Sequence, residues 1–315
     1  MQSETSSRNQ RILSIHVTDV CNSRCLFCVV GVPDMKSDTI DQNRVLKVLI
    51  ENAEKGYDAV NIHGGEPTSF KNFLDILKVI KSLGYPSVIL QTNGRRMCQP
   101  EFVRRLKELN VSLAVISLHG STSLVHDWLT KAKGSFSEAI EGIRNAIDLG
   151  IAVRTNTVIC RQNITQLVQI IDLLNELGVK FVNISNIHPV GTAFKNFDTV
   201  VPNVKETTYW VTRAAQRALE TNLTLTLEGF PYCVVPGFED YHLESKAPEI
   251  NMEFRGNTID NYFEFMGRLR INGHVCDTCI YKNTCTGVYR EYVYKRGWVE
   301  FEESATCYQL NQKKV

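Results

Sequence analysis

The sequence predicts an α/β fold in which a partial (β/α)6, TIM-like barrel is followed by a small C-terminal domain. Apolar strand-like runs alternate six times with amphipathic helical stretches, a series typical of a parallel sheet with right-handed crossovers. Because a closed barrel of this type needs about eight such units, we expect an open barrel. After a polar tail at residues 1–10, we place the barrel at residues 11–222 and the second domain at 223–315.

The strands are predicted from apolar runs rich in branched residues, and the helices from the amphipathic stretches between them. Gly84, Gly150 and Gly178 follow three of the helical stretches and are typical stop signals. We expect strands at Ile12–Thr18, Ala59–His63, Ser87–Thr92, Ser112–Leu118, Ala152–Cys160 and Lys180–His188. We expect helices at Gln42–Lys55, Phe70–Leu83, Pro100–Leu109, Ser135–Leu149, Ile164–Leu177 and Val204–Thr221.

Polar residues alternate with apolar ones along every predicted strand, whereas a parallel sheet covered on both faces reads as almost continuously apolar. Burying an unpaired polar group costs roughly 1 to 3 kcal/mol, and an unpaired charge costs more. A polar chamber for substrate and cofactor therefore explains the pattern better than a core of internally paired groups. The residues in this phase are Ser14, His16, Thr18, Asn61, His63, Gln91, Asn93, Ser117, His119, Arg154, Asn156, Asn183 and Ser185.

Composition narrows the class of partner. The net charge of +1 gives no reason to expect nucleic-acid or membrane binding. No apolar N-terminal segment and no run of about 20 apolar residues occurs, so the sequence favours a cytoplasmic protein. Ten cysteines would be an odd disulfide framework in that compartment, and clustered cysteines there indicate metal binding.

A triplet of cysteines, Cys21, Cys25 and Cys28, directly follows the first predicted strand. Three thiols are too few for a closed structural zinc site, which takes four protein ligands. They are the right number for a cubane iron–sulfur cluster that keeps one iron open to an outside molecule. Taken alone, the triplet leaves zinc binding or plain burial open as alternatives.

The run Gly64-Gly65-Glu66-Pro67 follows the second strand, where two glycines allow close backbone approach and a carboxylate comes next. Together with the cysteine triplet, this run resembles the radical S-adenosylmethionine (radical SAM) superfamily. The resemblance implies a [4Fe-4S] cluster on the triplet, with S-adenosylmethionine bound at its open iron. It also implies that Gly64, Gly65 and Glu66 hold the amino group of the cofactor, for which a charge-assisted hydrogen bond is the physical reason.

The resemblance assigns further cofactor contacts. Phe27, just before the third cysteine, is expected near the adenine, and Asn93 belongs to the third-strand end. Ser117 occupies the place of a serine that meets the cofactor's carboxylate or ribose, and Val190 that of a turn whose backbone pairs with adenine. Thr130 stands where an arginine commonly binds the carboxylate, so Thr130 or a neighbouring group is expected to do so here.

A second group, Cys276, Cys279 and Cys285, is followed 22 residues later by Cys307. Four thiolates suit zinc and a cubane equally. The spacing resembles the SPASM and Twitch extensions of radical SAM enzymes, which implies one auxiliary [4Fe-4S] cluster in a Twitch/SPASM-like domain. Cys307 is the expected fourth ligand, with Cys233 as the alternative.

Two further cysteines, Cys160 and Cys233, are candidate hydrogen-atom donors to a substrate radical, a role that would suggest epimerisation. The alternative is that each is a small hydrophobic residue, as most unpaired core cysteines are. Arg154 and Asn156 are expected to line the substrate chamber beside Cys160.

The resemblance implies an oxidoreductase that reductively cleaves S-adenosylmethionine to a 5′-deoxyadenosyl radical and abstracts hydrogen from a substrate carbon. The favoured reaction is oxidation, crosslinking or epimerisation of a ribosomally made peptide. The alternatives are dehydrogenation or rearrangement of a small sugar-like or nucleotide-like molecule, and a non-catalytic iron–sulfur scaffold or electron-transfer protein. We expect a flavodoxin- or ferredoxin-type electron donor. Because only about 20 residues precede the triplet, a separate carrier protein could deliver a peptide.

Overall fold

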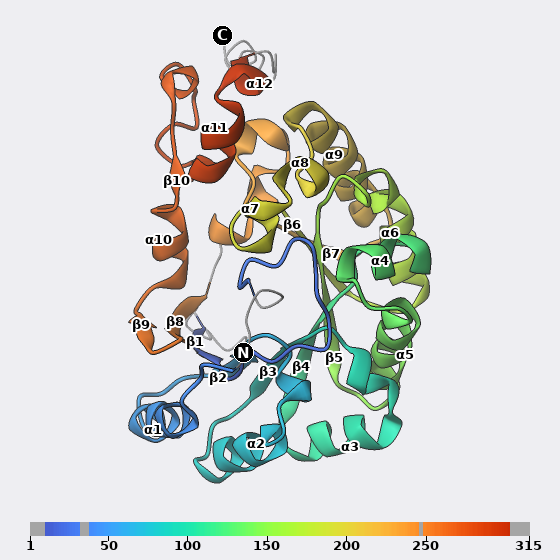
Figure 1. Ribbon diagram of the computed structural model, residues 1–315, viewed down its shortest axis with the longest axis vertical. Coiled ribbons are helices and arrows are strands. Elements are labelled where there is room, and N and C mark those ends of the chain that lie inside the picture. The colour runs from blue at the N-terminus through green and yellow to red at the C-terminus, as the bar shows by residue number, and fades with distance from the viewer. Residues whose placement is uncertain (1–9, 32–37, 246–247, 303–315) are drawn as a thin grey trace, which may run out of the picture.

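The structure, a computed structural model, describes residues 10–31, 38–245 and 248–302. One sheet has the strand order β7-β6-β5-β4-β3-β2-β1-β8-β9, and its neighbours are parallel except for β8 and β9. Figure 1 shows these strands curving around a centre with helices outside, as in a partial barrel. The strands are β1 Arg11–His16, β2 Ala59–His63, β3 Val88–Thr92, β4 Val111–Ser117, β5 Ala152–Val158, β6 Phe181–Ser185, β7 Thr224–Glu228, β8 Glu249–Phe254 and β9 Asn257–Ile259.

Helices connect the strands and cover the outside of the sheet (Figure 1). A short antiparallel pair, β10 (Arg270–Ile271) and β11 (Val288–Tyr289), lies in the C-terminal part. Within the described ranges, no helix is long and apolar enough to cross a membrane. The helices are α1 Gln42–Asn52, α2 Phe73–Ser82, α3 Pro100–Glu108, α4 Ser123–Thr130, α5 Ser135–Asp148, α6 Leu167–Glu176, α7 Thr192–Lys195, α8 Phe197–Val200, α9 Val204–Glu220, α10 Tyr262–Gly267, α11 Arg290–Arg296 and α12 Val299–Glu302.

The predicted fold class is confirmed, since all six strand-and-helix units are present in the expected order. Several predicted strands were too long: β1 ends at His16, β5 at Val158 and β6 at Ser185. The residues beyond these points leave the sheet and form the loops that carry the candidate site.

Two strands of the sheet were not expected. β7 pairs with β6, and β8 pairs with β1 on the opposite side, with Ile12 opposite Ile250. Both strands lie beyond residue 222, where the sequence analysis placed the second domain. That division stays a prediction, while the sheet itself extends past it at both sides of the barrel.

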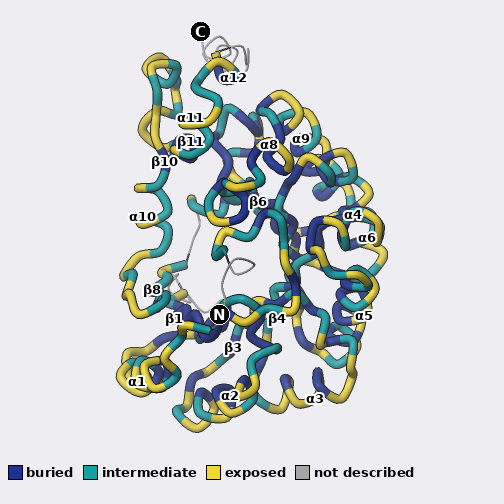
Figure 2. The backbone as a smooth tube through the Cα atoms, viewed as in Figure 1, coloured by how far each residue is buried: buried dark blue, intermediate teal, exposed yellow. Residues whose placement is uncertain are grey.

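The main core lies between the sheet and the outer helices (Figure 2). On β1, Leu13 and Ile15 point outward and belong to the same apolar cluster as Val45 and Leu49 of α1, which stand one helical turn apart. Asp41 begins this helix by accepting a hydrogen bond from the backbone N–H of Asn43 at 2.9 Å. The side chains that point outward from the strands are therefore apolar, and the polar side chains of the strands point inward.

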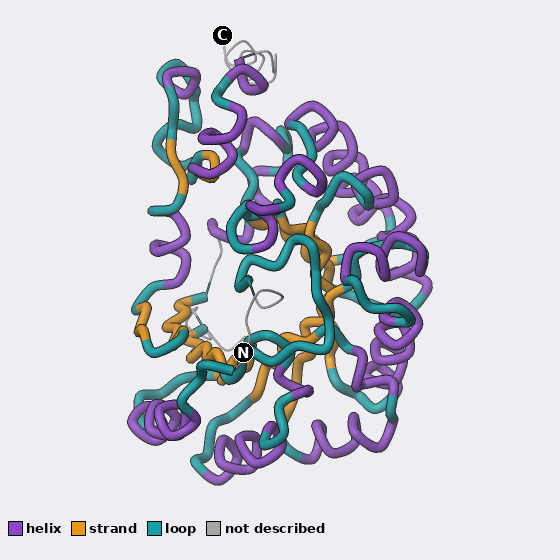
Figure 3. Tube along the Cα trace, viewed as in Figure 1, coloured by secondary structure: helices purple, strands orange, loops and turns teal. Residues whose placement is uncertain are grey.

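The inward phase of the strands faces the centre of the barrel, where Figure 3 shows loops instead of helices. Ser14 and Asn61 occupy this phase on adjacent strands, and the Asn61 amide donates to the Ser14 hydroxyl at 2.8 Å. Their neighbours in the other phase, such as Val60 and Ile62, join the outer core. The predicted alternation of polar and apolar residues thus separates the inward-facing polar side chains from the outer core.

Candidate active site

The cysteine triplet lies on the loop that leaves β1, and other loops fix this cysteine loop from two sides. The backbone N–H of Leu26 donates to the carbonyl of Leu129 at the end of α4, at 3.0 Å. From the opposite side, the hydroxyl of Thr192 donates to the carbonyls of Cys25 and Cys28, both at 3.1 Å. The three thiols are therefore held by a loop whose backbone is tied to the ends of two other units.

Gly191 explains how the loop after β6 comes so close to the triplet. A Cβ atom at this position would lie 2.5 Å from the carbonyl oxygen of Cys28 and 2.7 Å from that of Val29. Its φ of +58° also favours glycine. Val190, predicted to lie at the adenine, belongs to this turn, and that role stays a prediction.

A buried carboxylate, Asp19, braces the cysteine loop from the β8 side. It accepts hydrogen bonds from His16 at 2.9 Å, from the Arg255 guanidinium at 2.8 Å and from the Thr39 hydroxyl at 2.5 Å. Arg255 also donates to the carbonyl of Val30 at 3.1 Å. Arg255 therefore ties together the two sides of the cysteine loop, one before the first cysteine and one after the third.

The sequence analysis did not predict these contacts of Arg255 with Asp19 and Val30. Arg255 lies in the turn between β8 and β9, 236 residues from Asp19. No local pattern signals the pairing, because it depends on β8 joining the sheet beside β1.

The two glycines after β2 are required by a close approach of two backbones. A Cβ at Gly64 would lie 2.4 Å from the carbonyl oxygen of Thr18, and one at Gly65 would lie 2.4 Å from that of Val20. The backbone N–H groups of Gly65 and Glu66 donate to the same two carbonyls, both at 2.7 Å. The Gly-Gly-Glu run is thus packed directly against the segment that leads into the cysteine triplet.

The Glu66 carboxylate is buried and held in place by four donors. Its Oε1 accepts from the Thr68 hydroxyl at 2.6 Å, the Thr68 N–H at 3.0 Å and the Thr92 hydroxyl at 2.7 Å. Its Oε2 accepts from the Asn93 N–H at 2.6 Å. Burial raises the pKa of Glu66, while these hydrogen bonds oppose the shift. Since Oε2 has one donor, it retains capacity for a cationic group, which is the chemistry an ammonium needs.

Arg95, which follows the Asn93-Gly94 turn after β3, is a site residue that the sequence analysis did not name. Its guanidinium donates to the carbonyl of Asn22 and to the Glu138 carboxylate, both at 2.5 Å. The Asn93 amide reaches the side chain of Asn22 at 2.6 Å. Arg95 stands two residues after Asn93, which the sequence analysis placed at the third-strand end, and that position was the available signal. Its placement brings a positive charge beside the loop that carries Cys21.

Phe27 is buried and packs edge-on against His119, with ring centroids 4.6 Å apart. Burial holds the pKa of His119 well below its ordinary value, so this ring is neutral. Ser117 ends β4 in register with Asn156 of β5, at the same end of the sheet. The predicted roles of Phe27 and Ser117 at the cofactor stay predictions.

Thr130 is buried at the end of α4, with its hydroxyl 2.8 Å from that of Ser135. The adjacent carboxylate, Asp127, accepts from the backbone of Gly134 at 2.7 Å and of Phe136 at 2.8 Å, and so caps the start of α5. Asp127 therefore has a local structural use here, and contact between Thr130 and a cofactor stays a prediction.

A connected hydrogen-bond network joins the inward-facing polar side chains of β5, β6 and β7. The Asn183 amide donates to Asn156 and to Glu228, both at 2.9 Å. The Ser185 hydroxyl donates to the same two acceptors, at 2.8 and 3.0 Å. The predicted chamber residues of β5 and β6 thus come together around Glu228, a carboxylate supplied by the unexpected strand β7.

Arg154 of β5 joins the same hydrogen-bond network. Its Nη2 donates to the hydroxyl of Thr226 at 2.8 Å, and Thr226 in turn donates to Asn183 at 2.7 Å. Burial lowers the pKa of Arg154, and the nearby charge of Glu228 opposes this shift. Within the described part of the chain no carboxylate forms an ion pair with Arg154. Arg154 therefore has guanidinium donors that could bind an anionic or carbonyl group, and its role in a substrate chamber stays a prediction.

Two histidines, His16 and His63, lie in register at the ends of β1 and β2. The rings of His16 and His63 meet edge-on with centroids 5.3 Å apart. Burial lowers the pKa of His63 to about 3, so it is neutral near pH 7. The Nδ1 of His16 and the Nε2 of His63 are buried without a hydrogen-bond partner. These two nitrogens are therefore buried polar atoms beside the loops that follow β1 and β2.

Cys160 is fully buried in a small apolar cluster with Phe27, Leu129 and Phe197, and Cys25 packs against this cluster. Its surroundings are those of a small hydrophobic residue. A role as hydrogen-atom donor stays a prediction.

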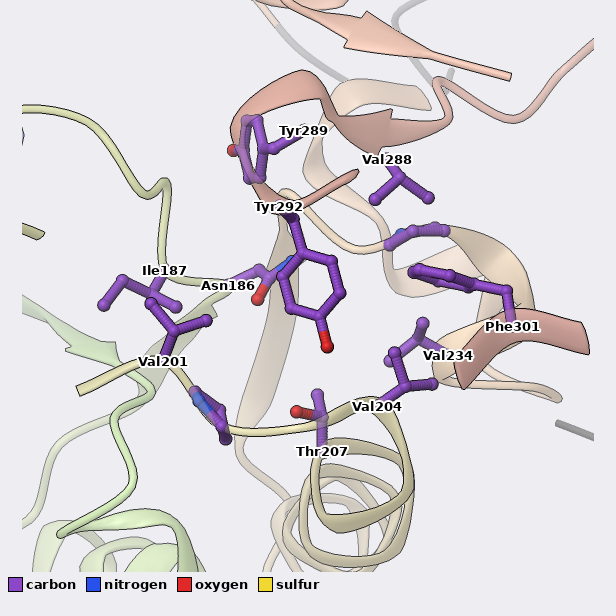
Figure 4. A pocket seen from close by; sticks show the side chains of 12 residues that line it. Asn186, Ile187, Val201, Val204, Thr207, Val234, Val288, Tyr289, Tyr292 and Phe301 are labelled. Carbon is purple, nitrogen blue, oxygen red and sulfur yellow. The ribbon is translucent and has the colours of Figure 1, made fainter. Parts of the chain in front are cut away.

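The loop between β10 and β11 carries Cys276, Cys279 and Cys285, and all three line one pocket. Cys233 lines the same pocket. Cys307 lies outside the described residues. The adjoining pocket of Figure 4 is lined mainly by apolar side chains from the barrel and from the C-terminal part, among them Val234, Val288 and Phe301. The second cysteine group therefore sits where the barrel and the C-terminal elements meet.

Comparison with known families identifies the protein's class. The model of the radical SAM superfamily matches residues 15–174, which include the cysteine triplet and the Gly-Gly-Glu run. The chain belongs to the radical SAM superfamily. The corresponding cofactors are a [4Fe-4S] cluster and S-adenosylmethionine, and the thiol triplet with the Glu66 carboxylate fits both.

Curated relatives include a probable GTP 3′,8-cyclase of Saccharolobus solfataricus, which is 32% identical over 192 residues. A second, from Sulfurisphaera tokodaii, is 30% identical over 187 residues. The first match covers 59% of this chain and 61% of the relative, and the second covers 59% of each. The chain thus spans about three fifths of the length of the curated relatives it matches.

Solved structures show the same fold. SuiB of Streptococcus suis bound to S-adenosylmethionine superposes with a TM-score of 0.67 at 16% identity, covering 95% of this chain and 77% of SuiB. The protein anSMEcpe with bound AdoMet and Kp18Cys peptide gives a TM-score of 0.66 at 14% identity, covering 96% and 99%. Because the likeness extends over the C-terminal part, it confirms the small region that follows the barrel.

Proposed function

We propose that this radical SAM protein is an enzyme that abstracts a hydrogen atom from a peptide bound in the polar chamber. The observation that carries the proposal is the charge of that chamber. Its wall presents the guanidinium of Arg154, the carboxylate of Glu228 and neutral amides and hydroxyls. Such a surface suits backbone amides and a substrate of low net charge.

When bound, the cluster and S-adenosylmethionine would supply 5′-deoxyadenosyl radical chemistry, with the electron coming from an external donor. The chain's own residues position these groups. Cys21, Cys25 and Cys28 would hold the cluster, and Glu66 would bind the cofactor's ammonium through the acceptor capacity of Oε2. Arg255 keeps the loop fixed from the β8 side. The walls around β5 to β7 orient the substrate and exclude water.

A nucleoside triphosphate is the second candidate substrate, because the curated relatives are probable GTP 3′,8-cyclases. A triphosphate carries several negative charges, and each buried charge left unpaired costs several kcal/mol. Three other arginines around the described site already pair with carboxylates: Arg95 with Glu138, Arg255 with Asp19 and Arg270 with Glu244. Of these arginines, Arg154 is the one left to bind the phosphates of a triphosphate, and the carboxylate of Glu228 would repel them. The charges of these side chains therefore favour a peptide over a nucleoside triphosphate as substrate.

The solved structures that share this fold include SuiB bound to its precursor peptide SuiA and anSMEcpe bound to a peptide. They support the proposal because two proteins of this fold have been solved with a bound peptide. A flavodoxin- or ferredoxin-type protein would supply the electron, a separate carrier could deliver the peptide, and the reaction would take place in the cytoplasm.

The test is cofactor cleavage with and without substrate. Anaerobically reconstituted protein, reduced with dithionite, receives S-adenosylmethionine together with GTP or with a library of synthetic peptides. Mass spectrometry measures 5′-deoxyadenosine and any change of peptide mass. The proposal predicts that peptides raise 5′-deoxyadenosine above the substrate-free level and GTP does not. Stimulation by GTP, with conversion of GTP to a new product, would contradict it.

A further inference from the structure

The outer side of α4 exposes two large apolar side chains. Leu124 is 81% exposed and Trp128 is 39% exposed, and they stand one helical turn apart on the same side of the helix. Lys131 follows on this side, and its Nζ lies 4.4 Å from the centre of the Trp128 ring. An exposed tryptophan and leucine beside a held cation are typical of a surface that binds another protein.

The same helix packs directly against the loop that carries the cysteine triplet. The backbone N–H of Arg24 donates to the carbonyl of Thr130 at 2.8 Å, and that of Leu26 donates to the carbonyl of Leu129 at 3.0 Å. On the buried side of α4, Leu129 belongs to the small apolar cluster against which Cys25 packs. Since an α-helix is about 10 Å across, a molecule bound on the outer side of α4 would lie within about one helix diameter of the cysteine loop.

The charged side chains around this surface are mostly positive. The segments concerned are the cysteine loop at residues 20–31, α4 with the turn after it at 123–134, and residues 192–197, which flank the loop from the α7 side (Figure 1). Within these segments the one carboxylate, Asp127, accepts backbone hydrogen bonds at the start of α5. The exposed cations are Arg24, Lys131, Lys133 and Lys195. The neighbouring Arg95 pairs with Glu138, so the excess of positive charge remains and would steer an acidic protein to this surface.

We propose that Leu124, Trp128, Lys131 and Lys133 form the surface on which an acidic electron-carrier protein docks to reduce the cluster of the triplet. The partner carries a low-potential one-electron centre surrounded by carboxylates. In the transfer the reduced carrier loses one electron and the cluster gains it, and no atom is exchanged. Transient redox interfaces bury less than about 1,200 Å² in total, so one helix face and the turn after it are sufficient. The inference rests on the proposed function, which needs an external electron donor.

The experiment first measures binding without turnover. The reconstituted, unreduced chain is titrated by calorimetry with an oxidised acidic flavodoxin and with an oxidised acidic ferredoxin, in the absence of S-adenosylmethionine. We expect one or both to bind, with a dissociation constant that rises about three- to tenfold in Lys133→Glu and in Leu124→Ser. The control variants change side chains of the same kinds elsewhere. Lys180→Glu lies at the opposite end of the strands from the triplet and Ile50→Ser lies on α1, where Ile50 is 60% exposed, and both should bind the carrier like the unmodified chain.

A second measurement compares two reductants in the formation of 5′-deoxyadenosine. With limiting carrier, reduced by NADPH through its own reductase, the Lys133 and Leu124 variants should be about three- to tenfold slower than the unmodified chain. With dithionite, a small ion that needs no docking surface, they should be equally fast, which shows that they are folded. Binding of neither carrier, unchanged binding by both variants, or an equal loss in the controls overturns the proposal. If the unmodified chain forms no 5′-deoxyadenosine with dithionite, the proposed function fails, while the titrations still decide the docking surface.

Discussion

Replacing Arg255 with methionine removes two N–H donors from the Asp19 carboxylate and one from the carbonyl of Val30, at 3.0, 2.8 and 3.1 Å. The Asp19 side chain is 0% exposed and that of Arg255 is 28% exposed. Breaking a buried ion pair by removing one partner costs about 3 to 5 kcal/mol. Because Arg255 is partly exposed and Asp19 retains His16 and Thr39, we expect the lower end, about 3 kcal/mol.

The assay is urea unfolding of the cluster-free chain, followed by tryptophan fluorescence under reducing conditions. Arg11→Met is the matched control, since it breaks another arginine pair between β1 and β8. That pair, with Glu249, has side chains 26% and 47% exposed, and its loss should cost about 0.5 kcal/mol. Equal effects of the two variants would refute the idea that Arg255 braces the cysteine loop. We also expect the Arg255 variant to retain less iron after reconstitution.

Gly65→Ala places a Cβ 2.4 Å from a backbone carbonyl oxygen, so it should displace the Gly-Gly-Glu run and lower the free energy of unfolding by about 1 to 3 kcal/mol. In the control variant Gly267→Ala the new Cβ meets no atom within 4 Å, and the loss should be less than about 1 kcal/mol. Equal midpoints of urea unfolding for the two variants would refute this reasoning. Burial alone would raise the pKa of Asp127, but hydrogen bonds from Phe136, Gly134 and Ser135 outweigh it and hold the pKa below its ordinary value. A carboxylate with a lowered pKa stabilises the folded state at pH values above its ordinary pKa, and this stabilisation is lost as acid protonates it. Asp127→Asn should therefore lower the free energy of unfolding more at pH 7 than at pH 3. An equal loss at both pH values would contradict the capping role. Arg154→Met should abolish the peptide-dependent formation of 5′-deoxyadenosine, measured by mass spectrometry, while cofactor cleavage without substrate continues. Replacing the exposed Arg161 with methionine should leave both activities unchanged. Full peptide turnover by the Arg154 variant would show that Arg154 does not contact the substrate.

The sequence predicted those parts of the site that depend on local spacing. The triplet of Cys21, Cys25 and Cys28 and the Gly-Gly-Glu run each follow a strand, so strand order alone placed them at one end of the barrel. The alternation of polar and apolar residues on β5 and β6 likewise predicted Asn156 and Asn183 on the chamber side. Periodicity suffices here because neighbouring parallel strands share a register.

The remaining features depend on contacts between distant segments. Glu228 was missed because β7 is a short run of alternating threonine and leucine that ends in a charge. Arg255 reaches Asp19 only because β8, with its two glutamates and an asparagine, pairs with β1. Thr130 shows what a local motif leaves out, since its hydroxyl lies 2.8 Å from that of Ser135, and its expected contact with the cofactor stays a prediction. Motif spacing cannot reveal which side chains a tertiary contact has already engaged.

One measurement tests the account most directly. The unmodified chain and the variant with all three triplet cysteines changed to alanine are reconstituted anaerobically, reduced with dithionite and given S-adenosylmethionine. Iron per chain and 5′-deoxyadenosine are then measured. We expect about eight irons and 5′-deoxyadenosine from the unmodified chain, and about four irons with no 5′-deoxyadenosine from the variant. About four irons and no 5′-deoxyadenosine from the unmodified chain would contradict a two-cluster radical enzyme and indicate a scaffold or electron-transfer protein.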